Sequence, residues 1–144
     1  MYLTAKEVAK MIRKIGLRQA GLISITTCIA AVTVHILVIF RLIPYTWING
    51  GRSATYEIAR QTSISSIPYF IIVMFIALLA SGIISVRWNR VVKNSFSILL
   101  WLLVAYNCLA LIMQLLGTPF EKIVMSLVCV FSIIAGIRLA IEKR

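Results

Sequence analysis

The chain has 144 residues, of which 61% are hydrophobic and 13% are charged, and its mean hydropathy is +1.00. A soluble domain is about half apolar and about a quarter charged, so this composition excludes a soluble domain and a disordered tail. The formal charge is +11, and the basic residues that produce it flank apolar runs. We therefore expect it to set membrane topology, and we expect no nucleic-acid partner.

Four apolar stretches are long enough to cross a bilayer, which needs about 20 helical residues for a core of ~30 Å. Continuous apolarity without alternation, and the need to satisfy backbone groups inside lipid, favour helices. We expect one all-α domain over residues 1–144, an integral membrane four-transmembrane-helix bundle. Its expected parts are a short cytoplasmic amphipathic helix within residues 1–18, transmembrane helices at 20–40, 67–86, 96–116 and 123–141, and a long structured outer loop at 41–66.

The Lys and Arg residues predict the orientation of this bundle. Eleven fall on one side of the expected spans: Lys6, Lys10, Arg13, Lys14, Arg18, Arg87, Arg90, Lys93, Arg138, Lys143 and Arg144. Four fall on the other side: Arg41, Arg52, Arg60 and Lys122. The excess of cationic side chains in cytoplasmic segments predicts a multi-pass protein of the cell (plasma or inner) membrane with both termini in the cytoplasm.

Three polar side chains interrupt the apolar spans and form a candidate intramembrane polar cluster, namely His35, Asn107 and Gln114. An ionisable group inside a membrane is a functional-site hypothesis by default, and histidine changes charge most readily near neutral pH. The structural alternative is a neutral His35 that only holds helices together through hydrogen bonds. Both interpretations stay open from the sequence.

The outer loop is a second candidate site, because an Asn49-Gly50-Gly51 turn permits positive φ and Ser53 is placed to cap a short following helix through about Thr62. Such a turn, flanked by arginines, gathers backbone N–H groups around an anion. The alternative is an interfacial loop that only anchors to lipid headgroups. The candidate anion- or ligand-binding residues are Arg41, Tyr45, Trp47, Asn49, Gly50, Gly51, Arg52, Tyr56, Glu57 and Arg60.

The turn between the last two spans explains one of the four acids structurally. In Gly117-Thr118-Pro119-Phe120-Glu121, Thr118 is expected to be the N-cap and Glu121 the capping-box acid, so Glu121 is not proposed as catalytic. The chain has one His and no Asp, which disfavours a metal site with several ligands. We expect no metal and no cofactor, and we assign no catalytic residue.

Three functions remain open from the sequence. The leading hypothesis is a non-enzymatic binding, sensing or accessory subunit that uses its outer loop and a seam of small residues along a helix. An oligomeric transporter of small solutes or lipids is the second hypothesis, and a small membrane enzyme acting on an anionic or lipid-like substrate is the third. The expected partners are the bilayer, a second copy or a larger membrane protein, and an anionic or lipid ligand.

Overall fold

The protein was analysed as a computed structural model that describes residues 5–87 and 89–142. Within these residues all regular structure is helical, and four helices are long and apolar enough to cross a membrane. The long helices are α2 (Leu17–Ile39), α3 (Tyr56–Ala80), α4 (Arg90–Leu115) and α5 (Ser126–Ala140), the last preceded by the π-helical turn η3 (Glu121–Met125). The expected all-α bundle with four candidate spans is therefore confirmed.

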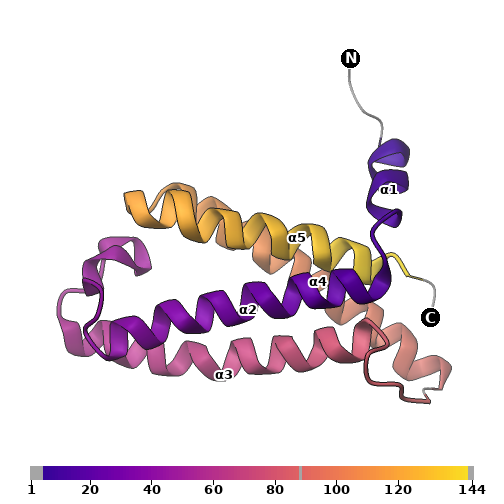
Figure 1. The fold of residues 1–144 in the computed structure, drawn as a ribbon, viewed down its shortest axis with the longest axis horizontal. Coiled ribbons are helices and arrows are strands. Elements are labelled where there is room, and N and C mark those ends of the chain that lie inside the picture. The colour runs from indigo at the N-terminus through magenta and orange to yellow at the C-terminus, as the bar shows by residue number, and fades with distance from the viewer. Residues whose placement is uncertain (1–4, 88, 143–144) are drawn as a thin grey trace.

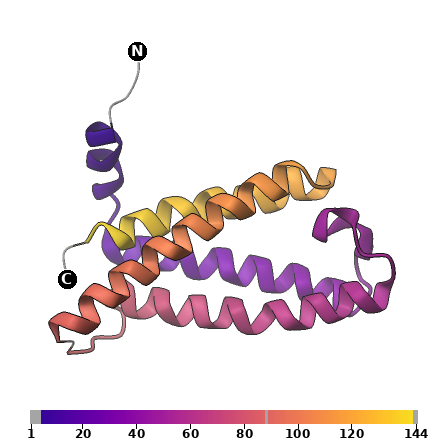
Figure 2. The same cartoon turned by 180° about the vertical axis from the view of Figure 1, so that it is seen from behind.

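The four long helices run back and forth between two ends of the bundle (Figure 1). We call the end that carries residues 40–55 and the 116–118 turn the loop end, and the opposite end, which carries both chain termini, the terminal end. Helix α2 packs closely along α3 and along α5, and α4 packs along α5. Helices α3 and α4 are not a close pair, and Figure 2 shows α4 diverging from α3 toward the loop end.

Small residues allow the close approach of α2 to α3. A Cβ on Gly21 would lie 2.3 Å from the Cβ of Ser81, so any larger residue at position 21 would push the helices apart. Beside them, Ala77 and Ala80 are almost fully buried. In lipid, where apolar surface gains little by being hidden, such close backbone contact is a main source of helix association.

Helix α3 corrects the expected boundaries of the second span. It begins at Tyr56 rather than residue 67, continues through Pro68, and ends at Ala80 rather than residue 86. Residues 56–66, expected in the outer loop, are therefore helical, and the N-cap is Thr55 rather than Ser53. Gly82, with φ +71°, follows the end of the helix, where such a residue commonly stops one.

The hydroxyl groups of the first part of α3 explain this difference. Thr62, Ser65 and Ser66 each donate a hydrogen bond to the helix carbonyl four residues earlier, at 2.9 to 3.0 Å. Side chains bonded in this way fit a helix without a partner from elsewhere. An apolarity criterion excluded them from the span, although nothing in their chemistry ends the helix.

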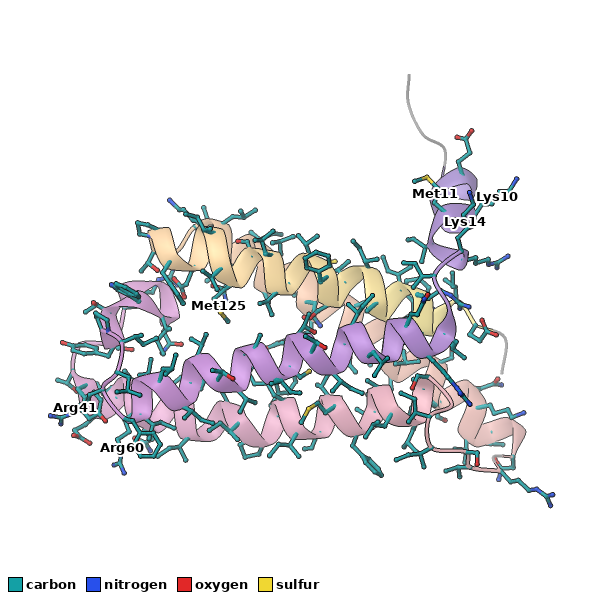
Figure 3. All side chains as sticks on the ribbon, in the orientation of Figure 1. Lys10, Met11, Lys14, Arg41, Arg60 and Met125 are labelled. Carbon is teal, nitrogen blue, oxygen red and sulfur yellow. The ribbon has the colours of Figure 1, made fainter. Side chains whose placement is uncertain are left out.

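A short helix, α1 (Ala5–Arg13), precedes the bundle, as expected within residues 1–18; residues 1–4 lie outside the described part of the chain. Gly16 is the N-cap of α2, so the chain changes direction there. Figure 1 shows α1 set across the direction of the long helices, and Figure 3 labels Lys10 and Met11 on it and Lys14 directly after its end.

Candidate functional site

A cavity of about 510 Å³ lies between the four long helices. Ligand pockets usually measure about 300–1,000 Å³, so the cavity has the size of a binding site. Helices α2, α3, α4 and α5 all contribute to its lining, together with Ile48 and Asn49 of the connection between α2 and α3. Met125, at the start of α5, belongs to the lining and is buried against α2 (Figure 3).

All three members of the expected polar cluster line this cavity. His35 is 8% exposed and its Nδ1 has no hydrogen-bond partner among the described residues; the same is true of the buried Oε1 of Gln114. Asn107 donates to the Leu103 carbonyl of its own helix at 2.8 Å. Buried polar groups are normally paired, so two orphaned atoms beside one cavity indicate a place where a ligand or water completes the bonding.

The cavity changes character along its length. Tyr69 of α3 and Tyr106 of α4 both line it, and their rings are 5.3 Å apart between centroids. Toward the loop end the lining on these two helices is largely polar, with Thr62, Ser65, Ser66, Ala110 and Gln114. Toward the terminal end it is apolar, with Val73, Ile76, Ala77, Leu100 and Leu103. The α3 and α4 side of the cavity therefore presents polar groups in the half toward the loop end and hydrocarbon in the half toward the terminal end.

The polar residues of α3 form a stripe that the sequence analysis missed. Thr62, Ser65, Ser66 and Tyr69 are spaced i, i+3, i+4 and i+7, which places them on one face of a helix. That spacing was visible in the sequence. The stripe was missed because the expected short helix ended at about Thr62 and the expected span began at residue 67, so the four residues were not placed on one helix.

The terminal end of the cavity is closed by a buried apolar cluster. Its members come from all four long helices and are Ala20, Ala77, Ala80, Phe96, Leu100, Leu139 and Ala140. Two hydroxyl groups of the lining in this half are paired: Ser132 donates to the Thr27 hydroxyl at 2.9 Å, and Thr27 donates to the Ser24 carbonyl at 2.8 Å. This end consequently offers a ligand little beyond apolar contact.

The loop end of the cavity is covered by Ile48 and Asn49, which we call the roof. Ile48 is 3% exposed and packs in a second buried cluster with Ala31, Val34, Val38, Ala59 and Met125. The Glu121 carboxylate fixes the roof to the start of α5 by accepting from the Gly50 N–H at 2.9 and 3.0 Å. The roof is thus held by packing and by an ionic hydrogen bond.

Glu121 also performs its expected capping role. It accepts from the Thr118 N–H at 2.9 Å, while its own N–H donates to the Thr118 hydroxyl at 3.3 Å. This confirms the predicted capping box. The Thr118 hydroxyl in turn donates to the Trp47 carbonyl at 2.6 Å, and the Trp47 ring stacks on Phe120 with 5.3 Å between centroids.

The glycine turn holds an anion, but that anion is part of the protein. Asn49, Gly50 and Gly51 all have φ between +57° and +67°, as the turn signal predicted. The Gly50 N–H binds Glu121, and the Gly51 N–H donates to the Ile48 carbonyl. The expectation that this turn offers free N–H groups to an external anion is therefore wrong for these two groups. The sequence could not reveal the pairing, because Glu121 lies 71 residues away.

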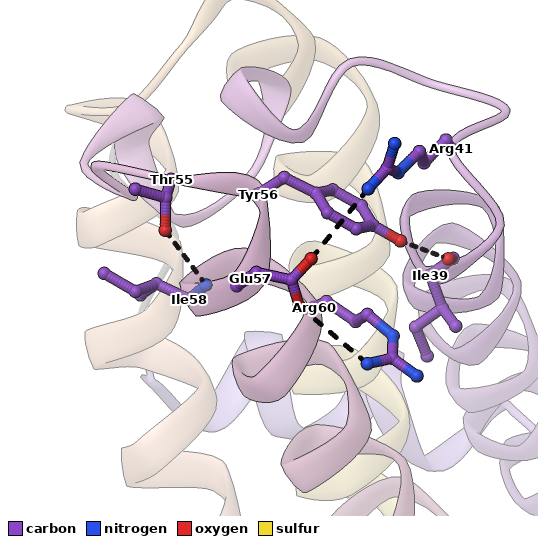
Figure 4. Close-up of polar contacts among 7 residues, drawn as sticks. All are labelled: Ile39, Arg41, Thr55, Tyr56, Glu57, Ile58 and Arg60. Atoms are coloured by element: carbon purple, nitrogen blue, oxygen red, sulfur yellow. Dashed lines mark hydrogen bonds and ion pairs between the residues drawn. The ribbon is translucent and has the colours of Figure 1, made fainter.

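The remaining loop candidates gather around Glu57, in what we call the rim: Arg41, Tyr56, Glu57 and Arg60 (Figure 4). Glu57 lies 3.9 Å from Arg41 and 3.9 Å from Arg60, and its side chain is 70% exposed. The Arg41 guanidinium sits 4.0 Å from the centre of the Tyr56 ring, whose hydroxyl donates to the Ile39 carbonyl. Tyr45 packs edge-on against Tyr56. Two of the three expected anion-binding arginines are thus paired with an acid of the chain.

Arg52 is exposed and separate from those ion pairs. Within the described part of the chain, no Lys or Arg lines the cavity, whereas the Glu121 carboxylate does. An anionic group placed inside would be buried without a basic partner, which is costly in a low-dielectric interior. The cavity therefore fits uncharged polar groups better than anions.

Comparison of the chain with protein-family models, with curated proteins and with solved structures finds no match in any of the three.

Proposed function

We propose that this is a non-enzymatic membrane protein that binds a lipid-like molecule with an uncharged polar group in the cavity between its four long helices. The observation that carries the proposal is that His35 and Gln114 line a cavity of about 510 Å³ and that each has a buried polar atom, Nδ1 and Oε1 respectively, without a hydrogen-bond partner among the described residues. A hydroxyl group of the ligand can donate to Gln114 Oε1, which only accepts, or bond to His35 Nδ1. A hydrocarbon chain would fill the apolar half between Val73 and Leu100.

The lining also supports the choice among the earlier hypotheses. The terminal end of the cavity is filled by the apolar cluster around Leu100 and Leu139, which favours a binding cavity over a continuous transport pathway. Among the residues that the structure describes, His35 has no acid partner of the kind that orients a catalytic base, because the acid beside the cavity, Glu121, bonds to Gly50 and Thr118. Binding is accordingly the function that these contacts support best.

The proposed setting is the cell membrane, with both termini in the cytoplasm. The support is the distribution of basic residues, eleven on the terminal side and four on the loop side, together with the excess of cationic residues usual in cytoplasmic segments. Lys143 and Arg144 of that count lie outside the described residues. In this orientation α1 would lie along the inner leaflet, where Lys10 and Lys14 meet anionic headgroups.

The proposal is tested with two ligands that share a chain and differ in charge. Purified protein is titrated with a long-chain alcohol and with the fatty acid of the same chain length, and the free energy of unfolding is measured in a mild detergent. The alcohol should stabilise the fold, by about 2.7 kcal/mol at a hundredfold excess over its Kd. The fatty acid, ionised at neutral pH, should stabilise it far less.

Two variants make the test specific to the cavity. Gln114→Leu removes the orphaned Oε1 and should weaken binding of the alcohol. Met113→Leu changes the neighbouring exposed residue and should leave binding unchanged. Equal stabilisation by alcohol and acid would contradict the uncharged-ligand proposal, and stabilisation by neither would contradict binding in the cavity.

A further inference from the structure

The cavity has four kinds of boundary, and three of them are closed. The roof covers the loop end and is fixed by Glu121. The apolar cluster around Leu139 fills the terminal end. The pairs α2–α3, α2–α5 and α4–α5 pack closely. Toward the loop end, where α5 separates from α2 in Figure 1, Ile48 and Met125 are buried in a cluster with Val34 and Val38 of α2. The side between α3 and α4, which are not a close pair, is the boundary left.

This side is bridged by two aromatic rings rather than by packed helix surfaces. Tyr69 and Tyr106 meet at 5.3 Å with an angle of 57° between their planes, and α4 diverges from α3 toward the loop end beyond them (Figure 2). Tyr106 is 54% exposed, and Thr62 and Ser65, which line the cavity, are also exposed. One aromatic pair is a weak contact compared with an interlocked helix interface, so this boundary is the easiest to open.

Helices α3 and α4 also carry large apolar side chains on their exposed surfaces. They include Ile64, Ile71, Ile72, Phe75, Leu102, Leu109 and Met113. Exposed apolar surface of this extent on a candidate spanning helix is suited to hydrocarbon rather than to water. A molecule that reaches the gap from outside therefore comes from the bilayer.

We infer that the ligand is a membrane lipid with an uncharged head, and that it enters the cavity sideways from the bilayer between α3 and α4. We call this opening the portal, defined by Ser66 and Tyr69 on α3 and by Tyr106 and Ala110 on α4. The hydrocarbon chain passes the tyrosine pair into the apolar half, and the hydroxyl head stays in the polar half near Gln114. This inference rests on the proposed function and adds the source and the route of the ligand.

The test closes the portal or the roof in turn with matched cross-links. In a background with Cys28, Cys108 and Cys129 replaced, the portal variant is Tyr69→Cys/Tyr106→Cys and the roof variant is Trp47→Cys/Phe120→Cys. The two aromatic pairs replaced have the same centroid separation, 5.3 Å. A short bifunctional thiol reagent joins each pair. Should the tyrosine variant misfold, Ser66→Cys/Ala110→Cys closes the same portal one helical turn nearer the loop end.

Each protein is first loaded with a long-chain alcohol, cross-linked, and reconstituted into phosphatidylcholine vesicles that contain the deuterated alcohol. Native mass spectrometry of the re-extracted protein then follows the replacement of bound alcohol by its deuterated form. The portal cross-link should slow exchange by about tenfold or more, which corresponds to a barrier increase of about 1.4 kcal/mol. The roof cross-link should leave exchange at the rate of the uncross-linked roof variant. The uncross-linked tyrosine variant lacks the aromatic bridge and should exchange at least as fast as the background protein, so the portal cross-link is compared with this variant.

The outcomes separate the two proposals. If the background protein binds no alcohol, the proposed function fails. If it binds alcohol but exchange is slowed by the roof cross-link and not by the portal cross-link, the ligand enters from the aqueous side and the lateral route is wrong. Equal exchange in all cross-linked forms would also overturn the portal.

Discussion

The two acids at the loop end of the molecule are bonded in opposite ways. Glu57 of the rim is 70% exposed on its side chain and meets two arginines at 3.9 Å. Glu121 is 4% exposed and has no arginine partner within residues 5–87 and 89–142, yet its carboxylate accepts hydrogen bonds from the backbone N–H groups of Gly50 and Thr118 at 2.9 to 3.0 Å. Exposed ion pairs contribute little, whereas short hydrogen bonds to a buried carboxylate are strong. Glu121, although it pairs with no arginine among the described residues, is therefore the acid that fixes the roof of the cavity to the start of α5.

The largest effect is expected for Glu121→Ala. This change leaves the N–H groups of Gly50 and Thr118 without their acceptor, and each such loss costs about 1–3 kcal/mol when the donor stays buried. We expect the free energy of unfolding in mixed micelles to fall by roughly 2–4 kcal/mol, and residues 40–55 to become accessible to protease.

Glu121→Gln serves as the matched control. Its amide oxygen keeps one acceptor at nearly the same position, so the loss of stability should be smaller than for Glu121→Ala. The comparison between the acids would be broken if Glu121→Ala were as stable as the native chain and its loop equally protected.

The smallest effect is expected for Glu57→Gln. Its ion pairs with Arg41 and Arg60 are long and exposed, so the free energy of unfolding should change by less than about 1 kcal/mol. The difference should shrink further as salt is added, because solvent-exposed charges are screened. Unfolding measured at low and high salt checks both points. A loss in the free energy of unfolding as large as that of Glu121→Ala would show that the ion pairs of the rim, and not Glu121, stabilise residues 40–55.

The fold was largely predictable from the sequence because lipid imposes one strong constraint, a run of apolar residues long enough to cross the core. This constraint located all four long helices. It failed at the start of α3, where Thr62, Ser65 and Ser66 make a helix that is polar on its cavity side. Their hydroxyls bond to carbonyls of the same helix. The polar residues there therefore line the cavity and do not mark the end of a helix.

The candidate site was predictable only in part, and for a physical reason. Single polar residues inside apolar spans stand out, so His35, Asn107 and Gln114 could be selected, and all three line the cavity. A contact such as that between Gly50 and Glu121 depends on packing between segments 71 residues apart and leaves no local pattern. The same applies to the pairing of Arg41 with Glu57. Arg60, in contrast, lies three residues after Glu57, and that spacing on one helix face was visible in the sequence.

The most direct test of binding in the cavity compares one substitution at two places on α4. Ala110 lines the cavity, whereas Ala105 is exposed on the same helix and is not part of the lining. Ala110→Phe should fill the polar half, and stabilisation by the long-chain alcohol should be lost while Ala105→Phe retains it. Alcohol binding by Ala110→Phe as tight as that of the native chain would contradict the cavity as the binding site.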